Sequence, residues 1–301
     1  MVRKATMARD AEELYRGRKS AFHDLCASDA ALEANTQLER ALLYHRLGYG
    51  CVAFQERADA ARVSQLSTRF APSDLTSLPS NLLRSPWRPN GLAANPPAKL
   101  SQLSRLTVTV DEPEAAIAAL SSKAAASYDV LAVEPVSERA FAAACNVLKA
   151  DIIAVDLSSR LPFKLKPTLV KAAVARGLAF EVACAPLLRD AAARRQTLVN
   201  AQALVRETRG RAIVLGNAAR VLAEIRRAAP GDVATLGALF GMTRPQAVAA
   251  TTSTPAEVVR RARARRACGG VAELHPKKRV RALATKGDTA GQESDAKAVR
   301  V

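Results

Sequence analysis

The sequence predicts an α/β protein whose strands close into a (β/α) barrel of the TIM type. Short apolar runs alternate with alanine-rich segments of helical period along most of the 301 residues. The runs are continuously apolar, as expected for parallel strands buried on both faces, and seven or eight such units suit a closed barrel. The alternative is an open doubly wound sheet. It usually carries a glycine-rich turn after its first strand, and neither GxGxxG nor GxxxxGK(S/T) occurs here.

Each predicted strand is a short apolar run between polar or alanine-rich segments. The strands are predicted at 21–26, 50–54, 106–110, 130–133, 152–155, 179–184 and 212–215. A further short strand is predicted at 233–236.

The helices between the strands are predicted from their period and from the residues at their ends. Pro113 suits the first turn of one helix, the Ser137 hydroxyl can cap another, and Gly177 suits the end of a third. The helices are predicted at 29–47, 114–126, 137–149, 167–176, 190–208 and 219–228.

The domain organisation follows from where this pattern fails. Six prolines and many Ser and Asn residues interrupt it between 55 and 102, which predicts a long surface insertion in the barrel. We therefore divide the chain into an N-terminal extension (1–20), a barrel (21–258) that contains this insertion, and a basic, mostly disordered tail (259–301). The tail begins helically at 260–266 before it becomes polar and charged.

The charge predicts a polyanionic partner. The chain carries a net charge of +17, and nucleic acids and anionic membranes are the commonest polyanions in a cell. Residues 158–211 hold 11 basic and 3 acidic residues, and residues 260–301 hold 12 and 4. No apolar run approaches the ~18 residues of a membrane span, so no membrane partner is expected. The five widely spaced cysteines and the lack of a signal peptide indicate a reducing compartment.

Carboxylates lie at or near the ends of four predicted strands, where (β/α) barrels carry functional groups. They are Asp111, Glu134, Asp156 and Glu181. One interpretation, kept as the alternative function, is a metallohydrolase that acts on phosphate esters. The other is that these carboxylates cap helices or pair with Arg and Lys. Barrel metallohydrolases usually need several histidines, whereas this chain has three and no HxH or HExxH spacing, so no metal ligand is predicted.

Nucleophilic catalysis is also disfavoured by the sequence. Cys145 and Cys184 lie in apolar segments, where a free cysteine is usually a small buried hydrophobe. There is no GxSxG motif, and His23 is the only plausible base inside the fold. No catalytic residue is therefore predicted.

Basic residues in two neighbouring loops are the stronger functional signal. One cluster follows the strand at 152–155 and the other follows the strand at 179–184, so both belong to the loop face of the barrel. The predicted RNA-binding residues are Arg160, Lys164, Lys166, Arg189, Arg194 and Arg195. The alternative is a solvated helix face, which we accept for Lys171 and Arg176. Phe163 is the only aromatic residue nearby, which favours readout of shape and backbone over base stacking.

The tail contains a short basic cluster with two interpretations. It consists of Lys277, Lys278, Arg279 and Arg281. The cluster is predicted to be a nuclear-import signal, and the alternative is a solubilising extension that attracts nucleic acid.

Ordered sequence strings from 103 to about 266 resemble one known family, the thirty-kilodalton protein subunit of ribonuclease P and ribonuclease MRP. The strings follow the family's order along more than half of the chain. They are LSRLTV (103–108), YDVLAVEP (128–135), DIIAVD (151–156), RLPF (160–163) with Lys166, APLLRD (185–190), Arg194 with Arg195, Asn200, GNA (216–218) and PGDVATLGALFG (230–241). Upstream, FHDL (22–25) and GYGCVA (48–53) are similar to its first two strands.

The resemblance implies a TIM-like barrel without a catalytic site of its own. It implies a subunit that binds ribonuclease P RNA, and by extension MRP RNA, while that RNA and its Mg²⁺ remove the 5′ leader of precursor tRNA. No cofactor bound by the chain itself is expected. A smaller protein subunit is the implied protein partner, and the nucleus, with the nucleolus, is the expected location. The rival hypotheses are the metallohydrolase through Asp111, Asp156 and Glu181, and a nuclear adaptor protein whose charge is incidental.

Overall fold

The computed structural model of the chain describes residues 21–27, 34–66, 70–75 and 99–267. The predicted N-terminal extension, most of the central insertion and the import cluster at 277–281 lie outside the described residues. None of the described helices could span a lipid bilayer.

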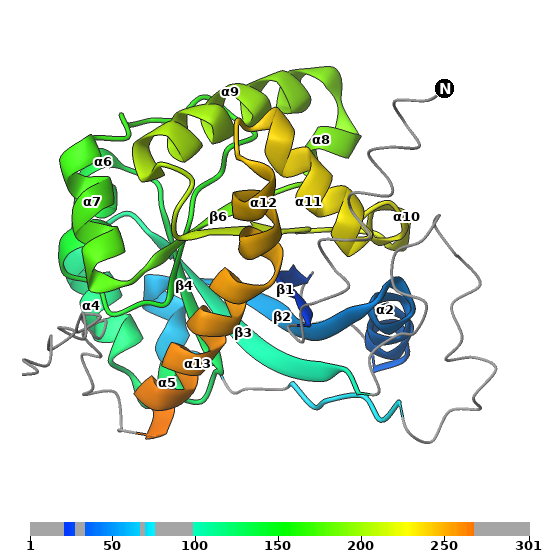
Figure 1. The fold of residues 1–301 in the computed structure, drawn as a ribbon. Coiled ribbons are helices and arrows are strands. Elements are labelled where there is room, and N and C mark those ends of the chain that lie inside the picture. Colours follow the sequence, from blue (N-terminus) through cyan, green and yellow to red (C-terminus); the bar gives the residue numbers. More distant parts are fainter. Residues whose placement is uncertain (1–20, 28–33, 67–69, 76–98, 268–301) are drawn as a thin grey trace, which may run out of the picture.

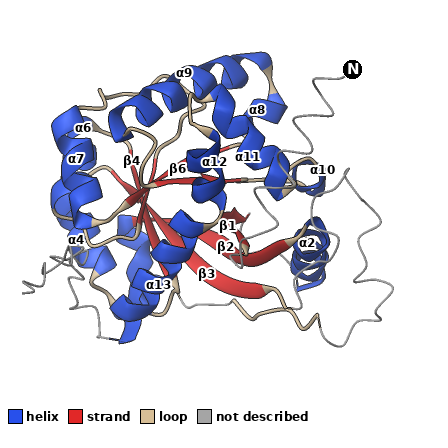
Figure 2. Cartoon of the chain, in the orientation of Figure 1, coloured by secondary structure: helices blue, strands red, loops and turns tan. Residues whose placement is uncertain are grey.

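Seven parallel strands pair in the order of the sequence and curve into a nearly closed barrel surrounded by helices (Figures 1 and 2). The strands are β1 (Phe22–Ala27), β2 (Tyr49–Asp59), β3 (Ser101–Val110), β4 (Val130–Pro135), β5 (Ile152–Ala154), β6 (Ala179–Ala183) and β7 (Ile213–Gly216). The predicted (β/α) barrel is confirmed.

The helices alternate with the strands along most of the chain. They are α2 (Ala34–Leu47), the 3₁₀ helix η1 (Ala60–Gln65), α4 (Pro113–Leu120), α5 (Lys123–Ala126), α6 (Glu138–Asn146), α7 (Pro167–Arg176), α8 (Pro186–Arg189), α9 (Ala191–Thr208), α10 (Leu222–Arg226), α11 (Pro230–Leu239), α12 (Arg244–Thr251) and α13 (Ser253–Ala267). The strand predicted at 233–236 is wrong, because these residues lie in α11. The four-residue run VATL is too short to show a distinguishing period, and Pro230 starts a helical turn shortly before it.

The predicted helix ends are built as their residues indicate. Pro113 occupies the first turn of α4, and the Ser137 Oγ accepts a hydrogen bond from the Ala140 amide at 3.2 Å, which caps α6. Gly177 ends α7 at φ +84°, a conformation that favours glycine. A Cβ at Gly177 would also lie 1.8 Å from the Arg261 guanidinium, so a larger residue there would have to displace the Arg261 side chain.

The predicted insertion at 55–102 begins too early, because β2 continues to Asp59. Residues 55–59 pair in register with 105–109 of β3, so the long strands β2 and β3 extend past the apolar runs that the sequence displays. Polar residues such as Gln55 and Arg57 are therefore part of the barrel. This extension brings both side chains to the C-terminal end of the strands.

The seam between β7 and β1 is closed by individual hydrogen bonds. The Ala218 amide donates to the Cys26 carbonyl at 2.9 Å. The buried Asp24 carboxylate accepts from the Cys26 amide at 3.0 Å and from the Asn217 amide at 3.2 Å. A Cβ at Gly216 would lie 3.0 Å from the Cys26 Cβ, so the absent side chain at Gly216 lets the two strands approach closely.

Helix α13 closes the N-terminal end of the barrel, so the predicted tail at 259–301 also begins too early. Val258, Val259 and Ala262 of α13 are buried against the residues that line the barrel interior. Those interior residues are Leu25, Cys51, Ala53, Leu103, Val130, Ala132, Ile152, Ala179 and Val214. The segment from 259 to 267 is therefore a structural part of the barrel.

Arginines of the basic run at 260–266 fasten α13 to the barrel. Arg261 donates to the carbonyl of the last residue of α7 at 2.7 Å. Arg265 pairs with the buried Asp151 carboxylate, with 3.0 Å between Nη2 and Oδ2, and Arg266 pairs with Asp129. These arginines hold α13 against the barrel. The sequence pattern had placed them in a basic tail.

Replacing Arg265 by Met should lower the free energy of unfolding by about 3 kcal/mol, because the Asp151 carboxylate then stays buried without its cation. Urea denaturation followed by circular dichroism measures this change. The control is Arg260→Met on the same helix, whose ion pair with Glu257 is more than half exposed. Because solvent screens such a pair, this control should leave the free energy of unfolding close to that of the wild type. Equal losses in the two variants would contradict the fastening role.

Asp24 should make the stability of the protein depend on pH. Burial raises the pKa of Asp24 from 3.8 to about 6, although the amides of Cys26 and Asn217 oppose this. The folded state therefore favours the protonated acid. The stabilisation of the fold by protonated Asp24 is complete below the pKa of Asp24 in the unfolded chain. It is lost as the pH rises through the pKa of Asp24 in the folded protein. Relative to Asp24→Asn, the wild-type free energy of unfolding should fall by about 3 kcal/mol between about pH 3.5 and about pH 7. A flat difference in denaturation experiments across this range would contradict the assignment.

Candidate functional site

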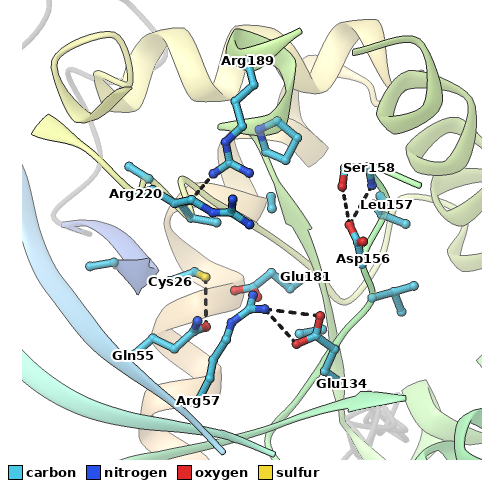
Figure 3. Close-up of a pocket in the computed structure, with 17 residues that line it drawn as sticks. Cys26, Gln55, Arg57, Glu134, Asp156, Leu157, Ser158, Glu181, Arg189 and Arg220 are labelled. Atoms are coloured by element: carbon cyan, nitrogen blue, oxygen red, sulfur yellow. Dashed lines mark hydrogen bonds and ion pairs between the residues drawn. The ribbon is translucent and has the colours of Figure 1, made fainter. Parts of the chain in front are cut away.

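A cavity of about 380 Å³ opens at the C-terminal end of the barrel (Figure 3). The ends of the strands and the loops that follow them form its walls. This is where (β/α) barrels place their ligand sites. Its polar lining residues are Cys26, Gln55, Arg57, Glu134, Asp156, Ser158, Glu181, Arg189 and Arg220.

A buried ion pair lies below the cavity and crosses the barrel from β3 to β6. The Arg105 guanidinium contacts Glu181 with both terminal nitrogens, at 2.5 Å (Nη1–Oε1) and 2.7 Å (Nη2–Oε2). The Arg105 side chain is fully buried, and that of Glu181 is 4% exposed. Burial alone would lower the pKa of Arg105, but the adjacent Glu181 carboxylate raises it above its ordinary value. Arg105 is therefore a buried cation in the folded protein.

A hydrogen-bond network surrounds this pair. The Arg105 Nε donates to the Thr107 Oγ1 at 3.0 Å, and the Thr107 hydroxyl donates to the Gln55 Oε1 at 3.1 Å. The Cys26 thiol donates to the same Gln55 oxygen at 3.3 Å. The Arg105 Nη1 also donates to the Leu25 carbonyl at 2.7 Å. The network gives the buried charges the partners that a low-dielectric interior requires.

Three arginines from three elements face the cavity. Arg57 of β2 pairs with Glu134 of β4 at 3.1 Å between Nη1 and Oε2. Arg189 of α8 pairs with Glu224 at 3.1 Å. Arg220 follows β7, and its side chain has no ion-pair partner within the described part of the chain. Figure 3 shows Arg189 and Arg220 on one side of the cavity, and Arg57 with Glu134 on another.

The four strand-end carboxylates do not form a metal site. Glu181 is held by Arg105, Glu134 pairs with Arg57, and Asp111 is exposed at the end of β3. Asp156 accepts hydrogen bonds from the Ser158 amide and hydroxyl and from Ser159. In the described ranges, no three His, Cys, Asp or Glu side chains gather as metal ligands would. The geometry thus gives the alternative metallohydrolase no support.

The cavity carboxylates have different ionisation preferences. Burial raises the pKa of Glu134, although Arg57 opposes it. Burial would also raise the pKa of Asp156, but the hydrogen bonds from Ser158 and Ser159 lower it below its ordinary value. Asp156 is therefore a charged acceptor at the cavity wall.

The cysteines and the histidine considered for catalysis lie away from a reactive arrangement. Cys145 and Cys184 are buried in the apolar layer outside the strands, and burial raises the pKa of each thiol to about 12. His23 lies near the start of β1, at the barrel end opposite the cavity, and its Nδ1 contacts the Ala21 carbonyl at 2.8 Å.

The loop after β5 carries one half of the predicted RNA-binding set. Arg160 and Lys164 are exposed and have no ion-pair partner among the described residues. Lys166 is exposed but pairs with Glu138 at the start of α6, at 2.6 Å. Phe163 is buried and stacks on Phe141 with ring centroids 4.6 Å apart, so its ring is unavailable to a base.

The second half of the set lies on α8 and α9, after β6. Arg189 lines the cavity and donates to the Ala218 carbonyl at 3.2 Å as well as to Glu224. Arg194 is exposed, and its Nε donates to the Leu187 carbonyl at 2.7 Å, which fixes the turn before α9. Arg195 is exposed on α9 and has no ion-pair partner in the described segments. Arg160, Lys164 and Arg195 are thus the members of the set whose side chains have neither an ion pair nor a hydrogen bond among the described residues.

Sequence reasoning missed Arg57, Arg105 and Arg220 as residues of this end of the barrel. Arg57 fell in the predicted insertion, and Arg105 lies directly before the apolar run at 106–110. Arg220 offered one usable signal, since it follows a predicted strand by five residues, where barrel loops carry ligand contacts.

These features define a class of protein: a (β/α) barrel with a charge-paired interior, whose ligand end presents guanidinium groups. Within the described residues it brings together neither a metal-ligand cluster nor a nucleophile with its base. Residues 21–267 match the family described as RNase P subunit p30. The chain belongs to this family.

Relatives of the chain include proteins of a mammal and of two yeasts. The chain is similar to the ribonuclease P protein subunit p30 of Mus musculus, with 34% identity over 210 residues that cover 69% of this chain and 73% of the mouse protein. It is 35% identical over 153 residues to the probable ribonuclease P protein subunit 3 of Schizosaccharomyces pombe, covering 50% and 63% of the two chains. It is 33% identical over 127 residues to the ribonuclease P/MRP protein subunit RPP1 of Saccharomyces cerevisiae, covering 42% and 43%.

A solved structure shares the fold. A chain of the cryo-EM structure of archaeal ribonuclease P with mature tRNA aligns with a TM-score of 0.56 at 14% identity. The alignment covers 81% of this chain and 92% of the archaeal one.

Replacing Glu181 by Ala should lower the free energy of unfolding by about 3–5 kcal/mol, because Arg105 is left as an unpaired buried cation. Chemical denaturation measures the loss, and the double variant Arg105→Met with Glu181→Leu should recover most of it. The matched control is Glu114→Ala, which breaks the exposed pair with Arg139 and should cost less than about 1 kcal/mol. A double variant no more stable than Glu181→Ala would contradict the assignment of the loss to an unpaired charge.

Proposed function

We propose that this chain is a non-catalytic protein subunit of ribonuclease P that binds the catalytic RNA and supports removal of the tRNA 5′ leader. The family match over the whole described barrel carries the proposal. The composition of the ligand end supports it, because three arginines line the cavity and, among the described residues, its carboxylates do not gather as metal ligands would. Guanidinium groups bind phosphate oxygens with paired hydrogen bonds, which suits an RNA partner.

The RNA contact is proposed to involve the exposed cations that follow β5 and β6. We define Arg160, Lys164 and Arg195 as the basic loop surface, since these side chains are exposed and no hydrogen bond or ion pair with a described residue holds them. Lys166, Arg189 and Arg194 belong to the same loops, although each already has a protein partner. Cations placed this way release counterions when they approach phosphates, so binding should weaken as salt rises.

The partners follow from the same proposal. The RNA of ribonuclease P is the principal partner, and MRP RNA is a second one because the Saccharomyces cerevisiae relative is named a ribonuclease P/MRP subunit. A smaller protein subunit of the complex is the proposed protein partner, and precursor tRNA is reached through the assembled complex. The chemistry is assigned to Mg²⁺ held by the RNA, with no cofactor on this chain.

The proposed location is the nucleus, including the nucleolus. The basic cluster of Lys277, Lys278, Arg279 and Arg281 is proposed as the import signal and lies outside the described residues. Deleting the cluster from a fluorescently tagged chain should shift the protein to the cytoplasm.

Reversing the basic loop surface with Arg160→Glu, Lys164→Glu and Arg195→Glu should weaken binding to ribonuclease P RNA by tenfold or more, roughly 1.4 kcal/mol or above. It should also make the salt dependence of binding shallower, by about one unit of log–log slope for each phosphate that the protein no longer neutralises. Filter binding at several salt concentrations measures both effects.

The matched control reverses three exposed cations at the opposite end of the barrel. Lys123, Lys149 and Arg211 precede β4, β5 and β7, so their replacement by Glu changes the net charge by the same amount. This control should bind RNA more tightly than the loop variant. Equal losses in the two variants would show that only net charge matters, and would contradict the named surface.

A further inference from the structure

The cavity at the end of the barrel has the size and shape for one small ligand. Its volume of about 380 Å³ falls within the roughly 300–1,000 Å³ of small-molecule sites. Its floor is the Arg105–Glu181 pair, whose side chains are at most 4% exposed. Below this pair, the apolar interior and α13 fill the barrel. A polymer chain therefore cannot pass through the barrel, and the cavity can hold only one unit of such a chain.

One wall of the cavity suits a phosphate. Arg189 and Arg220 follow β6 and β7, the last two strands, and loops at this place hold phosphates in many (β/α) barrels. Glu224 positions both arginines, because its Oε1 accepts from the Arg189 Nε at 3.1 Å and its Oε2 accepts from the Arg220 amide at 2.7 Å. The Arg220 carbonyl accepts from Arg40 at 2.8 Å. The backbone of Arg220 is thus fixed, while its guanidinium lines the cavity without an ion-pair partner among the described residues.

The facing walls suit hydroxyl groups. The Asp156 Oδ1 accepts both the amide and the hydroxyl of Ser158, whereas the Oδ2 accepts one bond, from Ser159 at 3.2 Å. The Oδ2 therefore keeps a free lone pair at the cavity wall. Glu134 offers a second carboxylate, which pairs with Arg57 at the cavity wall. A bare polyanion would be repelled by these carboxylates, but a phosphate ester that also bears hydroxyl donors complements both walls (Figure 3).

We propose that this cavity binds one ribonucleotide, with its phosphate at Arg189 and Arg220 and its ribose hydroxyls donating to Asp156 and Glu134. The site itself is independent of any partner. An unpaired nucleotide of a bound RNA and a free nucleotide would supply the same chemistry to this site. Only the first of these two sources rests on the proposed function. Recognition of the 2′-hydroxyl distinguishes RNA from DNA at such a site.

The first test measures binding of three probes to the purified, RNA-free full chain by isothermal titration calorimetry. Adenosine 5′-monophosphate should bind, and 2′-deoxyadenosine 5′-monophosphate should bind about tenfold more weakly, as expected when one hydrogen bond to a charged group is removed. Inorganic phosphate should bind more weakly than either. Absence of adenosine monophosphate binding, or equal affinity for all three probes, overturns the proposal.

Variants then locate the binding. Arg220→Ala should weaken adenosine monophosphate binding by about tenfold or more, because it removes a charge-assisted contact to the phosphate. Arg226→Ala is the matched control on α10, since this exposed arginine does not line the cavity, and its affinity should equal that of the wild type. Asp156→Asn should remove the preference for the ribonucleotide over the deoxyribonucleotide. Circular dichroism checks the fold of each variant. Wild-type affinity of Arg220→Ala would overturn the assigned phosphate position.

The RNA arm separates the two sources of the nucleotide. Ribonuclease P RNA is added to the chain loaded with labelled adenosine monophosphate. Displacement of the label assigns the site to a nucleotide of the RNA, and retention assigns it to a free nucleotide. Failure of the proposed function is seen separately, as loss of RNA binding with the nucleotide site intact. Failure of the site is seen as intact RNA binding without nucleotide binding.

Discussion

The buried pair of Arg105 and Glu181 is the constraint on which the rest of the barrel depends. It joins β3 to β6 across the interior, at the depth where other (β/α) barrels pack layers of branched apolar side chains. Because neither charge is tolerated alone in a low dielectric, the surrounding Thr107, Gln55 and Leu25 carbonyl must be in position as well. The pair thus divides the barrel into an apolar lower half, sealed by α13, and a polar upper half open to ligands.

The polar upper half explains why this barrel fits a recognition role. Guanidinium groups from β2, α8 and the loop after β7 reach the cavity, and carboxylates hold two of them in place. Such a site is preorganised for binding, since its charges are oriented before a ligand arrives. Pairing with Arg57 and Arg105 also occupies Glu134 and Glu181, two of the strand-end carboxylates that a hydrolytic metal site would need. Membership of the RNase P subunit p30 family accords with a site that binds a ligand and holds no cluster of metal ligands among the described residues.

Local patterns predicted most of the fold, whereas pairings distant in sequence could not be predicted. The helix at 167–176 was predicted with its observed bounds, because Pro167 and Gly177 mark its ends. The strand observed at 101–110 was predicted to begin only at 106, because the charged Arg105 interrupts the apolar pattern. The carboxylate that neutralises Arg105 lies 76 residues away in the sequence. The place of Arg57 in the barrel could not be predicted either, because only pairing with β3 shows that β2 continues past its apolar run. The exposed cations of the loops could be proposed from the sequence, because they follow directly after predicted strands.

The position of α13 has a consequence for synthesis of the chain. The plug of the barrel is its last described helix, and the first strand meets the seventh only after β7 has been made. During translation, the interior apolar residues of all seven strands therefore emerge before Val258, Val259 and Ala262 can cover them. Completion of the fold is tied to the end of the barrel segment, so a nascent chain halted before α13 exposes an uncovered apolar mouth to chaperones and proteases.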